Sequence, residues 1–568
     1  MVAGTETPPA KKKKKRGQGK GRRVDINALM QVRELLADSP RQRDMLIEYL
    51  HRIQDRFGHL SAAHLVALAH ELKLATAEVY EVATFYHHFD VVRENDTVPA
   101  ELTVRVCDSV SCELAGSTEL IAGLTRTLGE SVRIQPVPCV GRCAEAPVAV
   151  VGFNPVDQAT VEDVQTHVNN RAVSPENPAT HISYSAYKAE GGYRAALECH
   201  DGTRSRESVI QLMKDSGLRG LGGAGFPAGT KWDIVSGQEA PRLMAVNVDE
   251  GEPGTFKDRF YLESDPHRFL EGMLIAASVV GIDKIWVYTR DEYALGRQIL
   301  ESELAALQAD PPYPLPEIEL RRGAGAYICG EESAMIESIE GKRGLPRLRP
   351  PFVAQVGLFG RPTLEHNFET LFWVRDFIEK GHEWFTSEGR NDRVGLRSFS
   401  VSGRVNKPGV HLAPAGITMR ELIEEYCGGM LDGHDFYGYF PGGASGGILP
   451  AELGDLPLDF DTLQPYGCFI GSAAIVVLSN HDSAKQAALT SMRFFAHESC
   501  GQCTPCRVGT EKAAALMEAE TWDLERLEDL AVVMEDASIC GLGQAAPNPL
   551  RCVVKYFPHE LGLPERSS

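Results

Sequence analysis

Four cysteines in the first part of the chain come in two close pairs. Cys107 and Cys112 form a C-x4-C pair, Cys139 and Cys143 form a C-x3-C pair, and each pair follows a predicted strand, LTVRVC or VRIQPVPC. The four thiolates can therefore converge on a [2Fe–2S] cluster or on a four-coordinate zinc ion, since both need tetrahedral sulfur around each metal. Neither pair has the two-residue gap usual in structural zinc sites. Ordinary buried cysteines are the remaining interpretation.

A second set of cysteines, near the end of the chain, has a more specific spacing. Cys500, Cys503 and Cys506 form a C-x2-C-x2-C run within ESCGQCTPCR, which can place three thiolates around one [4Fe–4S] cube. Bacterial ferredoxins supply the next cysteine three residues later, followed by proline, but this chain does not, so the fourth ligand comes from elsewhere. We favour Cys540, in the glycine-flanked loop ASICGLG, over Cys552, which lies in the apolar run RCVVKYF.

The glycine-rich segment GLRGLGGAGFPAGTKW has the composition of a loop that holds a phosphate or a flat cofactor. Gly220, Gly222 and Gly225 satisfy G-x-G-x-x-G, but the dinucleotide motif needs a strand before it and a helix after it. The preceding SVIQLMKDSG has a helical pattern, and Pro227 interrupts the residues after the glycines. A non-Rossmann mononucleotide loop fits better, with glycines that let backbone amides approach a flavin or phosphate and with Lys231 as a positive charge. A purely structural glycine loop is the alternative.

Two further segments, 247–259 and 323–352, carry polar groups too densely for routine surface loops. The carboxylates that can accept hydrogen bonds from ribose hydroxyls, amides or flavin edges are Asp249, Glu250, Glu252, Glu331 and Glu332. The aromatic side chains that can stack on a flat ring are Phe256, Tyr327 and Phe352. Carboxylates this close repel one another and need donors. Each acid alone is more typical of a solvated surface, but together with the glycine loop they predict a cofactor site.

Hydrophobic periodicity indicates several units that position these motifs. Residues 26–90 have apolar side chains at helical intervals, and from Glu101 the pattern alternates between strand, cysteine loop and helix. A polar stretch without periodicity then precedes a larger α/β region that contains the glycine loop. Short strand-like runs come next, and the end of the chain is helical. A chain of 568 residues is long enough for several cores.

Composition excludes some classes of protein. The formal net charge of −20 disfavours nucleic acid as a partner, because phosphates would be repelled. The exception is the basic start, Lys11 to Lys15 and its neighbours, which cannot bury apolar surface and is expected to be a disordered tail. No segment has the length and apolar character of a membrane helix or of an export signal. Thirteen cysteines without such a signal indicate a reducing compartment, so we expect a cytoplasmic protein.

Five separated motifs together resemble the NADH-binding flavoprotein subunit of respiratory complex I. They are GLRGLGGAGFPAGTKW, NVDEGEPGTFKDR, GAGAYICGEES, RLRPPF and ESCGQCTPCR, in the expected order. The paired-cysteine unit after a helical bundle resembles the thioredoxin-like [2Fe–2S] subunit of the same enzyme. The two subunits are fused in this chain, and the resemblance extends from about residue 26 to 560.

The resemblance implies a role for individual residues. The flavin pocket would include Gly220, Gly222, Lys231, Asn247, Asp249, Glu250, Gly330, Glu331 and Asn367. Contacts with NAD(H) would come from Phe226, Glu252, Tyr327, Glu332 and Phe352. Glu252 and Glu332 would position the nucleotide, and no residue would act as a catalytic group. The cluster ligands would be the four paired cysteines and, for [4Fe–4S], Cys500, Cys503, Cys506 and Cys540. The family's Asn–Asn pair is His366–Asn367 here.

The fold implied by the resemblance is multidomain, with α/β and α+β units. We expect a disordered basic tail at 1–24, a helical bundle at 25–98, a thioredoxin-like [2Fe–2S] domain at 99–170, a linker at 171–195, a non-Rossmann FMN/NADH-binding α/β domain at 196–390, a small ubiquitin-like β-grasp domain that would bind soluble ligands at 391–476, and a helical [4Fe–4S] domain at 477–568.

Similar flavoprotein modules serve complex I, bidirectional NAD-reducing hydrogenases and NAD-dependent formate dehydrogenases. Leu221, where complex I commonly has Arg, and the HNFET segment look most like the formate dehydrogenase branch. We therefore expect the beta (diaphorase) subunit of a formate dehydrogenase, which exchanges hydride between NAD(H) and FMN and passes electrons through both clusters. Its partner would be an alpha subunit with Mo or W and further iron–sulfur clusters. A hydrogenase diaphorase or a fused complex I subunit is the first alternative, and a zinc-bearing nucleotide-binding scaffold is the second.

Overall fold

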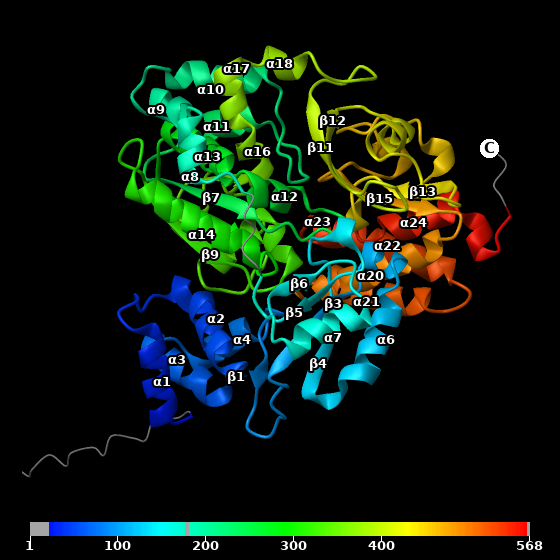
Figure 1. Ribbon diagram of the computed structural model, residues 1–568, viewed down its shortest axis with the longest axis horizontal. Helices are drawn as coiled ribbons and strands as arrows, with labels where there is room; N and C mark the ends of the chain where they lie inside the picture. The colour runs from blue at the N-terminus through cyan, green and yellow to red at the C-terminus, as the bar shows by residue number, and fades with distance from the viewer. Residues whose placement is uncertain (1–21, 176–180, 565–568) are drawn as a thin grey trace, which may run out of the picture.

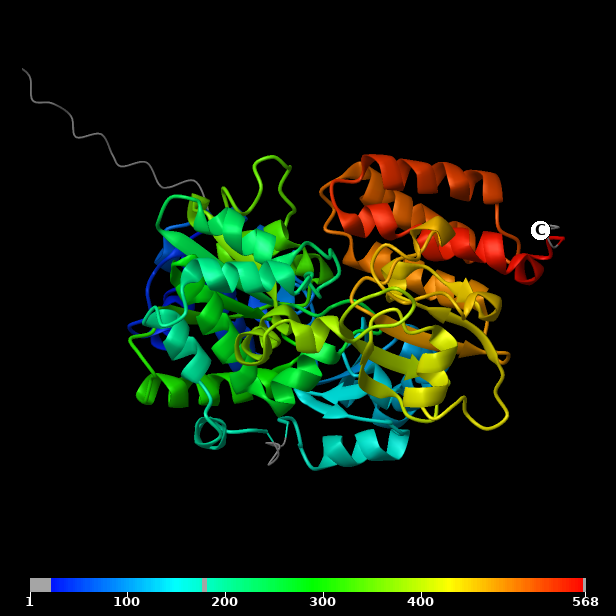
Figure 2. The ribbon, with the colours of Figure 1, turned by 90° about the horizontal axis from the view of Figure 1, so that it is seen from above.

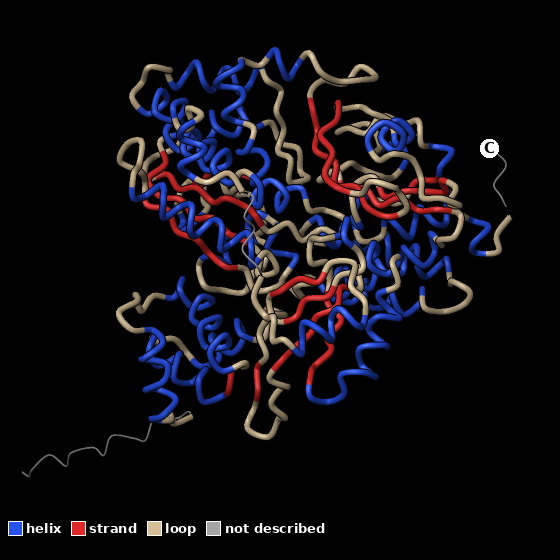
Figure 3. The backbone as a smooth tube through the Cα atoms, in the orientation of Figure 1, coloured by secondary structure: helices blue, strands red, loops and turns tan. Residues whose placement is uncertain are grey.

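The computed structural model describes residues 22–175 and 181–564, which form several packed units (Figure 1). Apart from residues 22–24, the expected basic tail lies outside the described residues. Figure 3 shows the strands gathered in separate sheets with helices around them. No helix in the described part of the chain is both long enough and apolar enough to cross a membrane.

The first unit is the predicted helical bundle. It contains α1 (Ile26–Leu36), α2 (Leu46–Phe57), α3 (Ala62–Leu72) and α4 (Thr76–Ala83), with the parallel pair β1 (Leu60–Ser61) and β2 (Val91–Val92). The side chains of Asp25 and Ser61 cap α1 and α3 by accepting hydrogen bonds from backbone N–H groups in the first turn.

The second unit is the predicted thioredoxin-like domain. Its elements are β3 (Leu102–Cys107), α5 (Val110–Leu114), α6 (Ser117–Leu128), β4 (Val132–Val137), β5 (Ala149–Val151), β6 (Asn154–Val156) and α7 (Val161–Asn169). The sheet order is β4-β3-β5-β6, and α6 and α7 pack side by side against it. Because β3 and β4 are parallel, the cysteines that follow them lie at the same edge of the sheet.

The largest unit has a parallel sheet of order β10-β7-β8-β9. Its strands are β7 (Arg242–Val248), β8 (Ile282–Thr289), β9 (Glu317–Arg322) and β10 (Thr363–Asn367). Its helices are α8 (Tyr184–Ala189), α9 (Arg194–His200), α10 (Arg206–Asp215), α11 (Ala228–Ser236), α12 (Lys257–Ser264), α13 (Pro266–Val280), α14 (Ala294–Ala309), α15 (Glu332–Ile339), α16 (Phe368–Phe372), α17 (Val374–Lys380) and α18 (Glu383–Thr386). The glycine loop follows α10 rather than a strand, so the unit is not a Rossmann fold, as predicted.

Alternate residues of this sheet face two different cores. Met244 and Val246 on β7 pack among the helices around α13, whereas Leu243 and Ala245 pack with α15 and the N-terminal bundle. Side chains of a strand alternate between faces, so an apolar run such as RLMAVNV is buried on both sides. The N-terminal helical bundle therefore covers one face of the parallel sheet.

The expected linker contains structured residues. Within 171–195, α8 is helical, and Tyr184, Tyr187 and Tyr193 are buried in the core around α13. The large unit thus begins before residue 196. The three aromatic side chains bury apolar area in its core, but they do not recur at a regular interval, so hydrophobic periodicity did not indicate them.

The small α+β unit has the sheet order β12-β11-β15-β13-β14. Its elements are β11 (Leu396–Gly403), β12 (Gly409–Pro414), α19 (Met419–Glu421), β13 (Phe436–Phe440), β14 (Leu449–Pro450) and β15 (Ala474–Ser479). The C-terminal helices are α20 (Ala484–Glu498), α21 (Thr504–Met517), α22 (Leu524–Ala537), α23 (Gly541–Ala545) and α24 (Asn548–Tyr556). Figure 2 shows these helices stacked at one side of the molecule, next to the small unit.

Candidate functional site

The four paired cysteines meet in the interior, at the sheet edge formed by β3 and β4. All four are buried, and the Sγ atoms of Cys139 and Cys143 lie 3.3 Å apart. Contacts with Cys112 and Cys139 raise the pKa of Cys107, so these thiols are also neighbours. None of the thirteen cysteines, all within the described residues, forms a disulfide.

The distances between sulfur atoms favour a two-iron cluster over a zinc ion. A zinc ion at about 2.3 Å from four tetrahedral thiolates would hold all four sulfurs within about 4 Å of one another. In the described part of the chain, no group of three cysteine sulfurs lies within 4.8 Å of one another. Contacts link Cys107 to Cys112, Cys107 to Cys139 and Cys139 to Cys143, but the four sulfurs do not surround one point. This spread suits the two iron atoms of a [2Fe–2S] cluster better than a single ion.

The C-terminal cysteines border a second small pocket. Cys500, Cys503, Cys506 and Cys540 line it together, with Cys540 at the start of α23. Burial raises the pKa of Cys540 to about 12, so this side chain is a neutral thiol unless a positive partner such as a metal ion binds it. Cys552, the alternative fourth ligand, lies 3.5 Å from the sulfur of Cys468 in a different core.

A cavity of about 560 Å³ lies where the large unit, the small unit and the C-terminal helices meet. This volume is typical of a site for a cofactor of FMN size. The expected flavin and nucleotide contacts that line it are Gly222, Asn247, Asp249, Glu250, Glu252, Tyr327, Gly330, Glu331 and Asn367. Strands β7 and β10 are parallel neighbours, so the residues after β7 and at the end of β10 are delivered to the same edge.

Five expected contacts do not line this cavity: Gly220, Phe226, Lys231, Glu332 and Phe352. The backbone N–H of Gly220 donates to the carbonyl of Phe226 at 2.8 Å and closes the glycine loop. The ammonium of Lys231 is 3.1 Å from the Glu365 carboxylate. Phe226 and Phe352 are instead about half exposed, at 46% and 53%.

Asp249 is the wall residue whose polar groups fit a bound molecule best. The Asn247 side chain accepts from the Asp249 N–H at 3.0 Å and donates to the Gly330 carbonyl at 2.9 Å. These two hydrogen bonds hold the backbone at Asp249 against that at Gly330. One oxygen of Asp249, Oδ2, is buried without a hydrogen-bond partner. Burial raises the pKa of Asp249 to about 8, although Arg290 opposes the shift. An unpaired buried oxygen is costly, so this atom fits a hydroxyl or N–H group of a ligand.

The raised pKa of Asp249 predicts how the flavin-free chain responds to pH. The folded state keeps a proton that the unfolded chain releases, so the stability contribution of Asp249 is lost as the pH rises from about 4 to about 8. Relative to Asp249→Asn, we expect the wild type to lose about 2 kcal/mol more of its free energy of unfolding between pH 6 and 8. Denaturant titrations at the two pH values measure this difference. Parallel curves for the two proteins would contradict it.

Glu252 connects the large unit to the small one across the cavity. Its carboxylate accepts hydrogen bonds from the backbone N–H of Ser445 at 2.7 Å, from the Ser445 hydroxyl at 2.8 Å, and from the Tyr327 hydroxyl. The wall of the cavity is therefore made by segments almost two hundred residues apart.

Several lining residues were missed by sequence reasoning. Lys257 and Asp258 line the cavity and are buried; Lys257 pairs with Asp258 at 2.7 Å and with Glu369 at 3.0 Å. The Asn367 side chain donates to Asp258 at 2.6 Å. Both residues lie within segment 247–259, so a lysine among the acidic residues of that segment was a signal that could have found this pair. The lining residues from later domains, Gly442, Ser445, Phe469, Gly471, Ser472, Glu535, Gly541, Leu542, Gln544, Ala545 and Asn548, had no local signal.

Both cysteine sites adjoin the cavity. Ile328 and Leu542 line the cavity and also the pocket of the C-terminal cysteines, so the two spaces share a wall. On the other side, Arg290 donates to the carbonyl oxygens of Glu250 and, at 2.7 Å, of Cys139. Electron carriers bound at the three places would therefore be close neighbours.

His366 has a structural role. Its Nε2 accepts from the indole N–H of Trp232 at 2.7 Å, and the ring is buried outside the cavity lining. The histidine at the position of the family's first asparagine therefore lies outside the cavity lining, whereas Asn367 is part of that lining.

Four family models match successive parts of the chain. They are a thioredoxin-like [2Fe-2S] ferredoxin at residues 32–171, the Nuo51 FMN-binding domain at 213–376, an SLBB domain at 398–449 and the NADH-ubiquinone oxidoreductase-F iron-sulfur binding region at 486–563. Their order confirms the predicted fold class.

Individual relatives agree with these models. The chain is 40% identical to the second F subunit of NADH-quinone oxidoreductase from Rhizobium meliloti (strain 1021), over 66% of this chain and 93% of the relative. It is 39% identical to the F subunit of NADH-quinone oxidoreductase from Aquifex aeolicus (strain VF5), over 70% of this chain and 94% of the relative. A chain of the NAD+-reducing [NiFe]-hydrogenase in the H2-reduced state superimposes with a TM-score of 0.81 at 32% identity, over 93% of this chain and 95% of the other.

Proposed function

The chain belongs to the family of the NADH-quinone oxidoreductase F subunits, and we propose that it is the diaphorase subunit of a multi-subunit oxidoreductase whose partner resembles that of an NAD+-reducing hydrogenase. Members of this family are NAD(H)-dependent electron-transfer proteins, and the cofactors of this chain are FMN, NAD(H), a [2Fe–2S] and a [4Fe–4S] cluster. The partner proposal is supported by one observation, the likeness to the hydrogenase chain over 93% of the sequence, including the fused N-terminal units.

The FMN contacts are proposed from the lining of the cavity. Bound FMN exchanges hydride with NAD(H) and single electrons with the clusters. Gly222, Asn247, Asp249, Glu250, Gly330, Glu331 and Asn367 would hold FMN, because all seven line the cavity. Gly220 and Lys231 would act indirectly, by closing the glycine loop and by pairing with Glu365.

The nucleotide contacts are proposed on similar grounds. Glu252 and Tyr327 line the cavity, where their mutual hydrogen bond orients the carboxylate toward Ser445. Phe226 and Phe352 expose apolar rings that can stack on a flat base. Glu332 is paired with Arg349 at 2.7 Å, and that arginine would have to move or share its charge when a nucleotide binds. The chain's own residues thus contribute positioning rather than proton transfer.

The proposed cluster ligands are the two sets of four cysteines. Cys107, Cys112, Cys139 and Cys143 would bind [2Fe–2S], and Cys500, Cys503, Cys506 and Cys540 would bind [4Fe–4S]. The thirteen cysteines without a disulfide also support a reducing, cytoplasmic location.

A formate-oxidising partner with Mo or W is the second candidate. It is favoured by Leu221 in the glycine loop and by the HNFET segment. Leu221 is buried, and its backbone N–H donates to the Thr370 hydroxyl at 2.9 Å. This leucine therefore contributes to the conformation of the loop that contains Gly222, rather than to a surface that a partner could contact.

Copurification of an affinity-tagged chain from its own cells separates the candidates. A large subunit with nickel supports the main proposal, and one with molybdenum or tungsten supports the second. The purified chain, loaded with FMN, should oxidise NADH with an artificial acceptor and contain about six iron atoms. Zinc with almost no iron, and no turnover in flavin-loaded protein, would instead identify a nucleotide-binding scaffold.

A further inference from the structure

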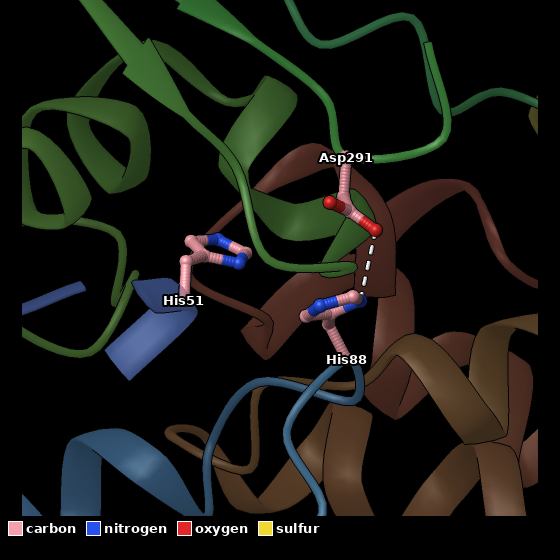
Figure 4. A group of neighbouring side chains, drawn as sticks. All are labelled: His51, His88 and Asp291. Atoms are coloured by element: carbon pink, nitrogen blue, oxygen red, sulfur yellow. Dashed lines mark ion pairs between the residues drawn. The ribbon is translucent and has the colours of Figure 1, made fainter. Parts of the chain in front are cut away.

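Two buried histidines and an aspartate meet where the helical bundle packs on the large unit (Figure 4). His51 comes from α2, His88 from the segment after α4, and Asp291 from the loop after β8. One ring nitrogen of each histidine and one oxygen of Asp291 lie within 4.8 Å of one another. None of the three lines the cofactor cavity, so they are separate from the flavin and nucleotide contacts proposed above.

Each histidine uses one nitrogen and leaves the other without a partner. Nε2 of His51 is 2.9 Å from the carbonyl oxygen of Gly323, and Nδ1 of His88 is 2.8 Å from Oδ2 of Asp291. These oxygens only accept, so the nitrogens that face them carry the protons. Nδ1 of His51 and Nε2 of His88 then present lone pairs, and both atoms are buried without a hydrogen-bond partner.

This arrangement is the one in which histidines bind metal ions. A ligating imidazole donates its other N–H to a carboxylate or a backbone carbonyl, which fixes the ring and its tautomer. His51 has the carbonyl version of this contact and His88 the carboxylate version. The two side chains are only 2% and 9% exposed, so leaving both lone pairs unsatisfied would be costly.

The charges at the site are compatible with a cation. Asp291 provides a carboxylate beside His88, with Oδ2 2.8 Å from Nδ1 of that ring. Arg322 contacts Oδ1 of Asp291 at 2.6 Å and is also paired with Asp55 at 2.6 Å. The Arg322 guanidinium is thus paired with two carboxylates, those of Asp291 and Asp55.

Two cavities border the three side chains. His51 lines a cavity of about 190 Å³, and His88 and Asp291 line another of about 170 Å³. Each histidine therefore borders a space large enough for water molecules, which would complete the coordination of an ion.

We propose that Nδ1 of His51 and Nε2 of His88 bind one divalent transition-metal ion of the zinc class, with Asp291 as the carboxylate that orients His88. Imidazole nitrogens select such ions over calcium or magnesium. The ion joins the helical bundle to the large unit. Asp291 is next in sequence to Arg290, which donates to the carbonyl oxygen of Cys139. The ion therefore stabilises the position of the loop that contains Cys139.

The test uses the full, cluster-loaded chain and zinc chloride in equilibrium dialysis, with zinc and iron measured in the same samples. The variants are His51→Gln, His88→Gln and Asp291→Asn. The matched control is His87→Gln, because His87 is the neighbour of His88 and belongs to a different candidate group with His497 and Glu498. We expect about one zinc per chain for wild type and H87Q. Affinity should fall at least about 10-fold in H51Q and H88Q, and about 10-fold in D291N.

Thermal unfolding provides a second measurement. Zinc should raise the Tm of wild type and H87Q and leave that of H51Q and H88Q unchanged. D291N retains both imidazoles and keeps the proposal testable if a histidine variant does not fold. Equal zinc binding by wild type, H51Q and H88Q at equal iron content would overturn the proposal. So would loss of the zinc in H87Q, or the absence of bound zinc in wild type.

Discussion

Replacing Cys540 with serine should remove the [4Fe–4S] cluster and leave the [2Fe–2S] cluster intact. Iron should fall from about six to about two atoms per chain, because three cysteines remain on one side of the pocket and the fourth position is lost. Electron exchange with the partner subunit should fall about 100-fold or more, the upper range for damage to a metal's surroundings. NADH oxidation by a small dye that reaches the flavin directly should persist. Iron analysis and the two assays measure these effects.

Cys552→Ser is the matched control for this prediction. Cys552 is the other cysteine available in the last segment of the chain, but its sulfur faces Cys468 at 3.5 Å rather than the C-x2-C-x2-C run. Its iron content should stay at about six atoms. The assignment of the fourth ligand is wrong if C552S loses the four iron atoms and C540S keeps them.

The sequence could predict which cysteines lie together because the signals for this are local. The C-x2-C-x2-C run and the two pairs fix which sulfurs are neighbours along the chain, and the strand pattern before Cys107 and Cys139 indicates that both loops lie at one sheet edge. The fourth [4Fe–4S] position came from an argument about loop and core composition, and the structure brings Cys540 to the pocket.

The cofactor cavity was only partly predictable. The lining residues after β7 and at the end of β10 could be predicted, because in the sequence polar residues directly follow apolar strands there. In contrast, Lys231, Glu332 and the exposed aromatic residues were expected at the site but do not line the cavity. Ser445 and Leu542 come from other domains, and domain packing leaves no pattern in a short window of sequence. The buried aromatic side chains of Tyr184 and Tyr187 were hidden for the same reason.

The two glycines of the predicted motif should differ sharply in their tolerance of a side chain. A Cβ at Gly222 would lie 2.9 Å from Cβ of Asn367, on the cavity wall, whereas a Cβ at Gly220 would meet nothing closer than 3.6 Å. Overpacking of this kind costs about 1–3 kcal/mol, so Gly222→Ala should weaken FMN binding about 5- to 150-fold. Flavin released on dilution, measured by fluorescence, gives the affinity.

Gly220→Ala is the control, and it tests the geometry of the loop as well as the site. Gly220 has a negative φ, which alanine adopts without strain. Its N–H donates to the carbonyl of Phe226, a hydrogen bond that alanine can also make. FMN affinity in G220A should therefore stay within about 3-fold of wild type, the size of the scatter among surface substitutions. If G220A releases flavin as readily as G222A, the loop holds FMN through its overall flexibility and the close approach at Gly222 is not the cause.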